Sequence, residues 1–451
     1  MIAFDLFIIL FIMCISKKII VIFKLLMFVL FFYFITIPVA FLLKDDSESY
    51  ARILMHELYS QDNIDILYCG ASHVSHGITP VLADKITKKN NFSSGTASQT
   101  IEGSYAILQQ AVKLYKIEKV FFEMDFAVSA KLSKNERNGF SADYLVSEYL
   151  KDPSIKFEYL KSISTPKYYL NHILPIGKDK YMSLNPKKLE KKIKAIINSD
   201  YFTYVYKSSN SEYDGKGCVL DLDYVPNGSF SNDRNEGCIN IQNISDEYKD
   251  TIDKIIALCK ENNIELIFYS MPCSDYYLAE KSNYDDYYTF CTDFLAQRGF
   301  PYYDFNLAKE KYLMLEDSDF SDDNHLSKKG VYKWTQVFCD YFFTGIIPQD
   351  DMFYSSYAKK IENQEDRIYG LVYLQSDDKK SMYIKPMVNH VDMSRITYDI
   401  YAHCGQEIIP IAEHTSDYQF SLPAGKSGKI RVISYIDGVK QNDCTENFAS
   451  F

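Results

Sequence analysis

Residues 65–77 have the sequence DILYCGASHVSHG, and this stretch decides the fold that we expect. The apolar run at residues 64–69 predicts a buried strand, which ends in Gly70-Ala71-Ser72-His73. A serine just past a strand and beside a glycine lies on a tight turn, with its hydroxyl exposed at the edge of the sheet, where loop amides can face a developing oxyanion. Ser72 is therefore a candidate nucleophile, although serine is also favoured at a helix N-cap.

The chain around this stretch alternates short apolar runs with amphipathic ones. Further strands are predicted at residues 119–124, 264–269 and 302–305, and helices at 101–116, 252–259, 287–297 and 327–342. Strands that alternate with helices predict a parallel sheet covered on both faces, which is a three-layer α/β/α fold. In such sheets the chemistry collects at the carboxyl ends of the strands.

Two segments depart from this alternation. Residues 126–245 are rich in Lys, Tyr, Ser and Asn, and we interpret them as an insertion that shapes a substrate cleft. From residue 366 the pattern changes to strands alone, which predicts a small β-sandwich that either binds glycan or only packs. The expected organisation is a membrane anchor at 1–44, an α/β domain at 45–350 and an all-β domain at 366–451.

The N-terminal segment predicts the membrane anchor. Residues 25–43 are uncharged and mostly apolar, and at about 1.5 Å per residue a helix of this length crosses a hydrocarbon core. Basic residues precede it and acidic residues follow it: Lys17, Lys18 and Lys24, then Asp45, Asp46 and Glu48. The positive-inside rule therefore places the chain after residue 44 outside the cytoplasm. An earlier apolar run at residues 2–16 is a candidate for a second membrane span. No A-x-A-like cleavage site follows the apolar stretch, which favours an anchor over a cleaved signal peptide.

Charge and cysteine spacing exclude other classes. The net charge of −11, without a basic stretch, argues against nucleic acid as a partner. None of the ten cysteines lies in a CxxC pair or a zinc-like cluster. Cys69 and Cys273 are expected to be buried thiols. Cys218 and Cys238 flank a polar loop and could form a disulfide if this part of the chain is extracytoplasmic, so both their paired and their free state remain alternatives.

A second chemical motif lies far downstream, at residues 319–330, with the sequence DFSDDNHLSKKG. An aspartate three residues before a histidine can hold the imidazole while its other nitrogen faces a serine. DxxH alone is common in surface loops, but this one follows the last predicted strand of the α/β region and opens a helix at Ser327. We therefore expect Asp322 and His325 to be the partners of Ser72.

Both motifs have other polar groups nearby in the sequence. His73 and His76 follow the nucleophile and are interpreted as loop histidines or as substrate contacts. Glu123 and Asp125 end a predicted strand, but together with Asp322 and Asp323 they match no recognised metal spacing, so no metal site is expected.

Three blocks in order resemble the SGNH (GDSL-like) hydrolase superfamily over residues 60–345. They are Gly-x-Ser-His after the first strand, Gly95-Thr-Ala-Ser-Gln-Thr-Ile-Glu-Gly-Ser-Tyr105 where the family has the end of its second strand, and Asp-x-x-His-Leu before the last helix. The likeness is closest to a membrane-anchored branch that modifies bacterial cell-surface polymers. That branch includes relatives of the alginate O-acetylation proteins and of the D-alanine transfer protein of teichoic acid synthesis.

The resemblance implies a role for each site residue. Ser72 is the nucleophile, His325 the base and Asp322 the group that orients it, and the N–H groups of Ser72 and Gly95 are the oxyanion donors. The family's third donor, an asparagine after the third strand, is missing, because this strand runs into Glu123-Met124-Asp125-Phe126. One lost donor costs about 2.7–4 kcal/mol of transition-state stabilisation. Three alternatives follow: the protein has low activity, another side chain replaces the missing donor, or the protein is a non-catalytic member of the superfamily.

The function expected from this resemblance is acyl transfer through a Ser72 ester, without a cofactor. It would add or remove O-acyl groups, chiefly acetyl, on a cell-surface polysaccharide or teichoic-type polymer, with a membrane-bound O-acyltransferase as partner. Two alternatives are a non-catalytic scaffold that binds glycan or the acyltransferase, and a lipid esterase at the membrane surface.

Overall fold

The computed structural model describes residues 2–47, 49–126, 141–176, 182–222, 228–230, 239–322 and 324–448. Its central sheet has five parallel strands in the order β2-β1-β3-β7-β8. These strands are β1 (Ile66–Cys69), β2 (Asn91–Ser93), β3 (Lys119–Glu123), β7 (Glu265–Ser270) and β8 (Tyr302–Asp304). Numbered within this sheet alone, the order is 2-1-3-4-5, the flavodoxin-like order, so the predicted parallel sheet is confirmed.

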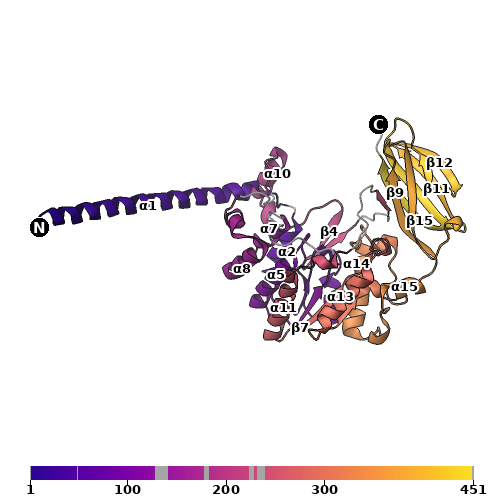
Figure 1. Cartoon of the computed structure of the whole chain (residues 1–451), viewed down its shortest axis with the longest axis horizontal. Coiled ribbons are helices and arrows are strands. Elements are labelled where there is room, and N and C mark those ends of the chain that lie inside the picture. Colours follow the sequence, from indigo (N-terminus) through magenta and orange to yellow (C-terminus); the bar gives the residue numbers. More distant parts are fainter. Residues whose placement is uncertain are drawn as a thin grey trace.

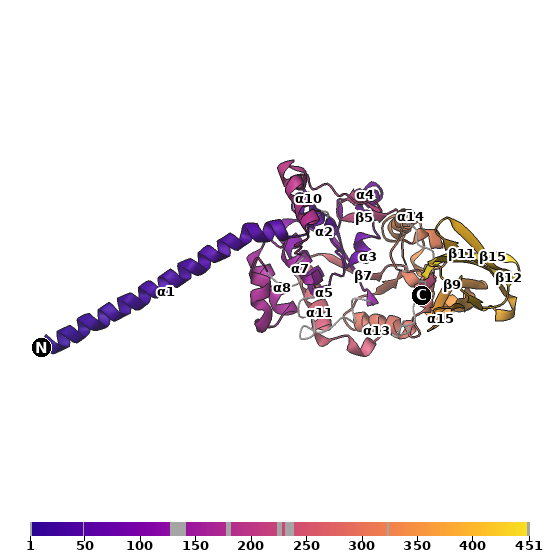
Figure 2. The same ribbon diagram turned by 90° about the horizontal axis from the view of Figure 1, so that it is seen from above.

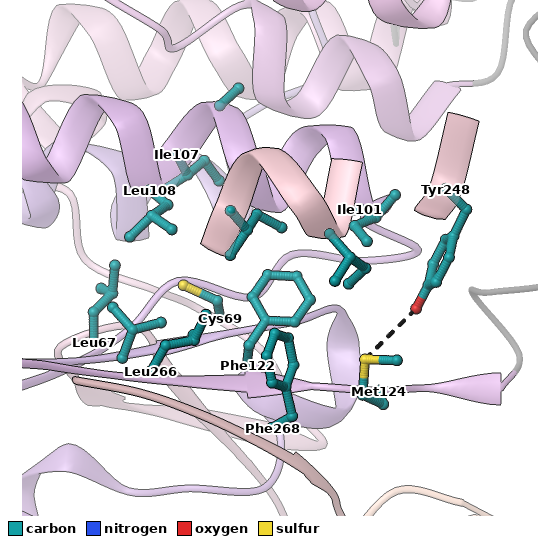
Figure 3. Close-up of a cluster of buried hydrophobic side chains, with 14 of the residues drawn as sticks. Leu67, Cys69, Ile101, Ile107, Leu108, Phe122, Met124, Tyr248, Leu266 and Phe268 are labelled. Atoms are coloured by element: carbon teal, nitrogen blue, oxygen red, sulfur yellow. Dashed lines mark hydrogen bonds between the residues drawn. The ribbon is translucent and has the colours of Figure 1, made fainter. Parts of the chain in front are cut away.

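Alternating side chains of the strands bury both faces of this sheet. Leu67, Cys69 and Phe122 enter one core, and Tyr68 and Phe121 enter the other. The first face is covered by α5 (Ile101–Leu114), α11 (Asp246–Glu261) and α13 (Tyr284–Ala296), and the second by α4 (Pro80–Thr87) and α14 (Lys328–Cys339). Figure 3 shows the first face, where strand side chains point towards the helices and the Tyr248 hydroxyl meets the Met124 sulfur at 3.9 Å.

The described part of the predicted insertion contains helices and short strands. It contains α7 (Ser141–Ser147), α8 (Pro153–Ile163), α9 (Tyr169–Ile173) and α10 (Pro186–Ile197), then the hairpin β4 (Ser211–Gly215) and β5 (Cys218–Asp221). Figure 1 shows α7, α8 and α10 near the end of the long N-terminal helix, on the side away from the C-terminal sheets.

Two four-stranded sheets form the C-terminal part. One has the order β13-β10-β9-β6 and the other β12-β11-β14-β15, and buried residues of both form one core. The strands are β9 (Arg367–Gln375), β10 (Ser381–Asn389), β11 (Ile396–Cys404), β12 (Glu407–Thr415), β13 (Gln419–Ser421), β14 (Gly428–Ile436) and β15 (Val439–Phe448). The predicted C-terminal antiparallel strands are therefore present.

One strand of these sheets comes from outside residues 366–451. β6 (Gly228–Phe230) comes from the insertion and pairs in parallel with β9, so residues 366–451 do not form the sheet alone. The pairing covers one edge of β9, whose backbone groups would otherwise be open to another chain. Short strands of this kind carry too little apolar alternation to be predicted from sequence.

The N-terminal helix α1 (Ile2–Leu43) projects as a rod from the rest of the molecule in both views (Figures 1 and 2). Its segment Ile19–Leu43 has a mean hydropathy of 2.7 and none of its most apolar part is buried, so it is long and apolar enough to cross a membrane. A signal sequence shares these properties. The two apolar runs of the sequence are parts of this single helix.

Trp334, the only tryptophan of the chain, reports directly on the core beneath α14. Its ring centroid lies 4.4 Å from that of buried Phe305. We predict that Phe305→Ala lowers the free energy of unfolding of this region by about 3–5 kcal/mol, because it leaves a cavity beside Trp334. Chemical denaturation followed by tryptophan fluorescence measures the change. Ile346→Ala, at a side chain that is 70% exposed, should change it by less than about 0.5 kcal/mol, and equal effects of both variants would contradict the packing.

Candidate active site

Ser72 lies where the chain leaves β1 at the carboxyl edge of the sheet. It begins the short helix α3 (Ser72–Ser75), two residues after Gly70. A Cβ atom at Gly70 would lie 2.4 Å from Val74 Cγ2 and 2.6 Å from Glu123 Oε2, so a glycine is needed for the helix to fold back on the strand ends. This close return holds the Ser72 hydroxyl at the edge of the sheet.

The structure brings His325 and Asp322 to Ser72. His325 Nε2 lies 2.9 Å from Ser72 Oγ, and His325 Nδ1 lies 2.8 Å from Asp322 Oδ2. The loop that carries the pair is fixed locally, because Asp322 Oδ1 accepts the backbone N–H groups of Asn324 and His325 at 3.0 and 2.7 Å. The three side chains thus form one hydrogen-bonded chain in the order serine, histidine, aspartate.

The charge on Asp322 suits this chain. Burial opposes its ionisation, but the hydrogen bond and charge of His325 and two backbone N–H donors outweigh burial and lower its pKa to about 2. An ionised Asp322 favours the imidazole tautomer with the proton on Nδ1, which leaves Nε2 free to accept the serine proton.

The loop after β2 packs directly against the serine turn. A Cβ atom at Gly95 would lie 2.1 Å from the Ala71 carbonyl oxygen, so only glycine fits there. Buried Gln99 joins the two loops, because its amide donates to the Gly70 carbonyl at 2.8 Å while its oxygen accepts the Thr96 hydroxyl at 2.8 Å. Sequence reasoning missed Gln99, although it lies inside the Gly95–Tyr105 block. The roles of the Ser72 and Gly95 amides as oxyanion donors stay predictions.

The place where an asparagine donor was missing holds a buried charged cluster. Glu123 Oε1 lies 3.1 Å and Asp125 Oδ2 3.8 Å from His73 Nδ1. Burial opposes protonation of His73, but the charges of Asp125 and Glu123 outweigh it and raise the pKa of His73 to about 9. The ring of His73 also meets the ring of His325 edge-on, with 5.1 Å between centroids.

The side chain of His73, in α3, is buried and only 5% exposed. One ligand atom from each of His73, Glu123 and Asp125 lies within 4.8 Å of the others, so the three could hold a metal ion. The sequence had suggested Asp322 and Asp323, not His73, as the neighbours of these two carboxylates. Asp322 is engaged by His325, and Asp323 lies outside the described residues.

A second histidine–aspartate pair, His76 and Asp221, lies near His325. His76 Nδ1 is 3.0 Å from Asp221 Oδ2, and this carboxylate also accepts the Ser321 hydroxyl at 3.1 Å. The His76 and His325 ring centroids are 5.6 Å apart. Asp221 ends β5, so the insertion contributes a side chain beside the candidate site.

The cysteines take no part in this arrangement of the described residues. Cys69, Cys218 and Cys273 are buried free thiols, as expected for the first and last of them. Cys238 lies outside the described residues, so its predicted pairing with Cys218 stays open.

The comparisons with known proteins give no family for the chain. No protein-family model and no curated protein matches it. Among solved structures, a double mutant of the Cellulomonas fimi endo-beta-1,4-mannanase aligns with 90% of this chain and 99% of its own at 10% identity and a TM-score of 0.14. A TM-score this low shows no common fold.

The geometry predicts that Ser72 reacts with a serine-directed fluorophosphonate. His325→Asn should slow the labelling by about 10²–10⁴-fold, because the general base is lost. The matched control is His390→Asn, an exposed histidine in the C-terminal sheets where asparagine tolerates the positive φ of 53°. Peptide mass spectrometry gives the labelled residue and its rate. Similar rates in both variants, or a label on another residue, would contradict the assignment.

Proposed function

We propose that this protein is a serine acyltransferase or esterase of the SGNH type, in which Ser72 carries the acyl group. The observation that supports it most is the hydrogen-bonded chain Ser72–His325–Asp322, assembled from two loops at the carboxyl edge of the sheet. The flavodoxin-like strand order supports it too, because ligands of such sheets bind beside the strand where the order reverses, and Ser72 follows that strand.

The proposed reaction has two halves. Ser72 Oγ attacks the carbonyl carbon of an acyl donor while His325 Nε2 takes its proton, and the N–H groups of Ser72 and Gly95 face the oxyanion. The tetrahedral intermediate expels the donor's alkoxide, which takes the proton from His325 and leaves acyl-Ser72. An acceptor hydroxyl then gives its proton to His325 Nε2 and attacks the ester carbonyl. The second tetrahedral intermediate expels Ser72 Oγ, which takes the proton back from His325, so the acyl group is transferred and both residues are restored.

The link between α1 and the body favours transfer near a membrane. Asp46, just after the helix, is buried, and its carboxylate accepts Lys192 Nζ at 2.7 Å and the Tyr201 hydroxyl at 3.1 Å. The helix is therefore joined to the insertion by a buried ion pair. A hydrolase gains nothing from such attachment, whereas a transferase supplied with acyl groups at the membrane does.

We therefore propose an acetyl group as cargo, a cell-surface polysaccharide or teichoic-type polymer as acceptor, and a membrane-bound O-acyltransferase as the partner that supplies acyl groups. In this proposal α1 is an anchor and the residues after 44 lie outside the cytoplasm, which is supported by the basic residues before the apolar segment and the acidic residues after it. A reporter fused after residue 60 that reads as cytoplasmic would contradict this orientation.

Transfer and hydrolysis can be separated with one substrate. Given an activated acetyl ester and a teichoic-type polymer or cell-wall glycan, the protein should acetylate the polymer faster than it releases acetate, because a bound acceptor hydroxyl is held in line with the ester. Mass spectrometry of the polymer and an acetate assay measure the two rates. Ser72→Ala should abolish both. Acetate alone across several acceptors would indicate an esterase, and neither product would indicate a non-catalytic scaffold.

A further inference from the structure

The cluster of His73, Glu123 and Asp125 is unusual in its burial and its place. The side chains are 5%, 0% and 8% exposed. His73 follows the end of β1, while Glu123 and Asp125 are two residues apart at the end of the neighbouring strand β3. All three therefore lie at the point where the strand order of the sheet reverses, which is where such sheets bind ligands.

The ligand atoms of the cluster lie close together. Glu123 Oε1 is at hydrogen-bond distance from His73 Nδ1, 3.1 Å, and Asp125 Oδ2 is at ion-pair distance, 3.8 Å. One ligand atom from each residue lies within 4.8 Å of the others. Ligand atoms that share one ion at about 2.0–2.2 Å are roughly 3–3.5 Å apart, so a small inward shift of the side chains would bring the three atoms onto one ion.

Two carboxylates are buried here beside one imidazole. In the described part of the chain, His73 is the cationic group that pairs with Glu123. Buried charges are normally paired or coordinate a metal, and a divalent ion balances both carboxylates while the imidazole stays neutral.

One atom of the cluster is left without a hydrogen bond among the described residues. Glu123 Oε2 is buried and has no hydrogen-bond partner among these residues. Gly70 packs against the same oxygen, which leaves no room for a side chain there. A carboxylate in this state retains the capacity to bind a metal ion through a second oxygen.

We propose that His73 Nδ1 and the carboxylates of Glu123 and Asp125 bind one divalent transition-metal ion, with Zn²⁺ or Mn²⁺ as the best match. Imidazole suits zinc and carboxylates suit manganese, whereas Ca²⁺ requires six to eight oxygen ligands that these residues do not supply. The ion cross-links the serine turn after β1 to the end of β3. This proposal does not depend on the acyl-transfer proposal.

The test uses the full chain in detergent, freed of metal with EDTA and then given Zn²⁺ or Mn²⁺ alone. After desalting, elemental analysis should find one equivalent of metal per chain. The thermal midpoint, followed by Trp334 fluorescence, should rise with metal concentration, because the ion binds only the folded state. No bound equivalent with either metal would overturn the proposal.

Variants locate the ion. Glu123→Gln and Asp125→Asn keep the size of each side chain, and each should lose the bound equivalent and the rise in midpoint. Asp221→Asn and Asp322→Asn alter the two neighbouring histidine–aspartate pairs and should keep both. Retention of the metal by folded Glu123→Gln and Asp125→Asn, or its loss in Asp322→Asn, would place the ion elsewhere and refute the site. If Glu123→Gln fails to fold, the less buried Asp125→Asn decides.

Discussion

The parallel pairing of β1 with β3 is the constraint on which the rest of the molecule depends. It aligns Ile66 with Lys119 and Cys69 with Phe122, so both strands end at the same edge. This places the turn at Gly70 beside Glu123 and sets Ser72 at the edge of the sheet. The loop before α14 then brings His325 to Ser72. The contact between Gly70 and Glu123 is too close for any side chain at residue 70. The register of two short strands therefore determines the geometry of the candidate site.

The sequence could predict the parts of the fold that follow hydrophobic periodicity. The apolar runs at Ile66–Cys69 and Lys119–Glu123 are β1 and β3, and the helical spacing after Ile101 is α5. It could not place β6, because three residues in a polar segment give no periodic signal and the strand depends on pairing with β9. It also did not predict the order of the strands, which arises from contacts between distant segments.

The candidate site shows the same division. Ser72, Asp322 and His325 belong to local patterns with a chemical meaning, and the structure brings them together across 253 residues of sequence between Ser72 and His325. His73 had no such pattern, because its burial against Glu123 and Asp125 arises only when β1 lies next to β3. His325 thus lies among several histidine–carboxylate pairs, one that orients it and two that flank it.

The central claim is that Ser72 carries an acyl group, and trapping that ester tests it most directly. The chain is mixed with an activated acetyl ester, quenched in acid within the first turnover, digested and analysed by peptide mass spectrometry. The account predicts one acetyl group on the peptide that contains Ser72, none in Ser72→Ala, and a much slower rise in His325→Asn. An unmodified Ser72 peptide while acetate is released, or an equal rise in His325→Asn, would contradict it.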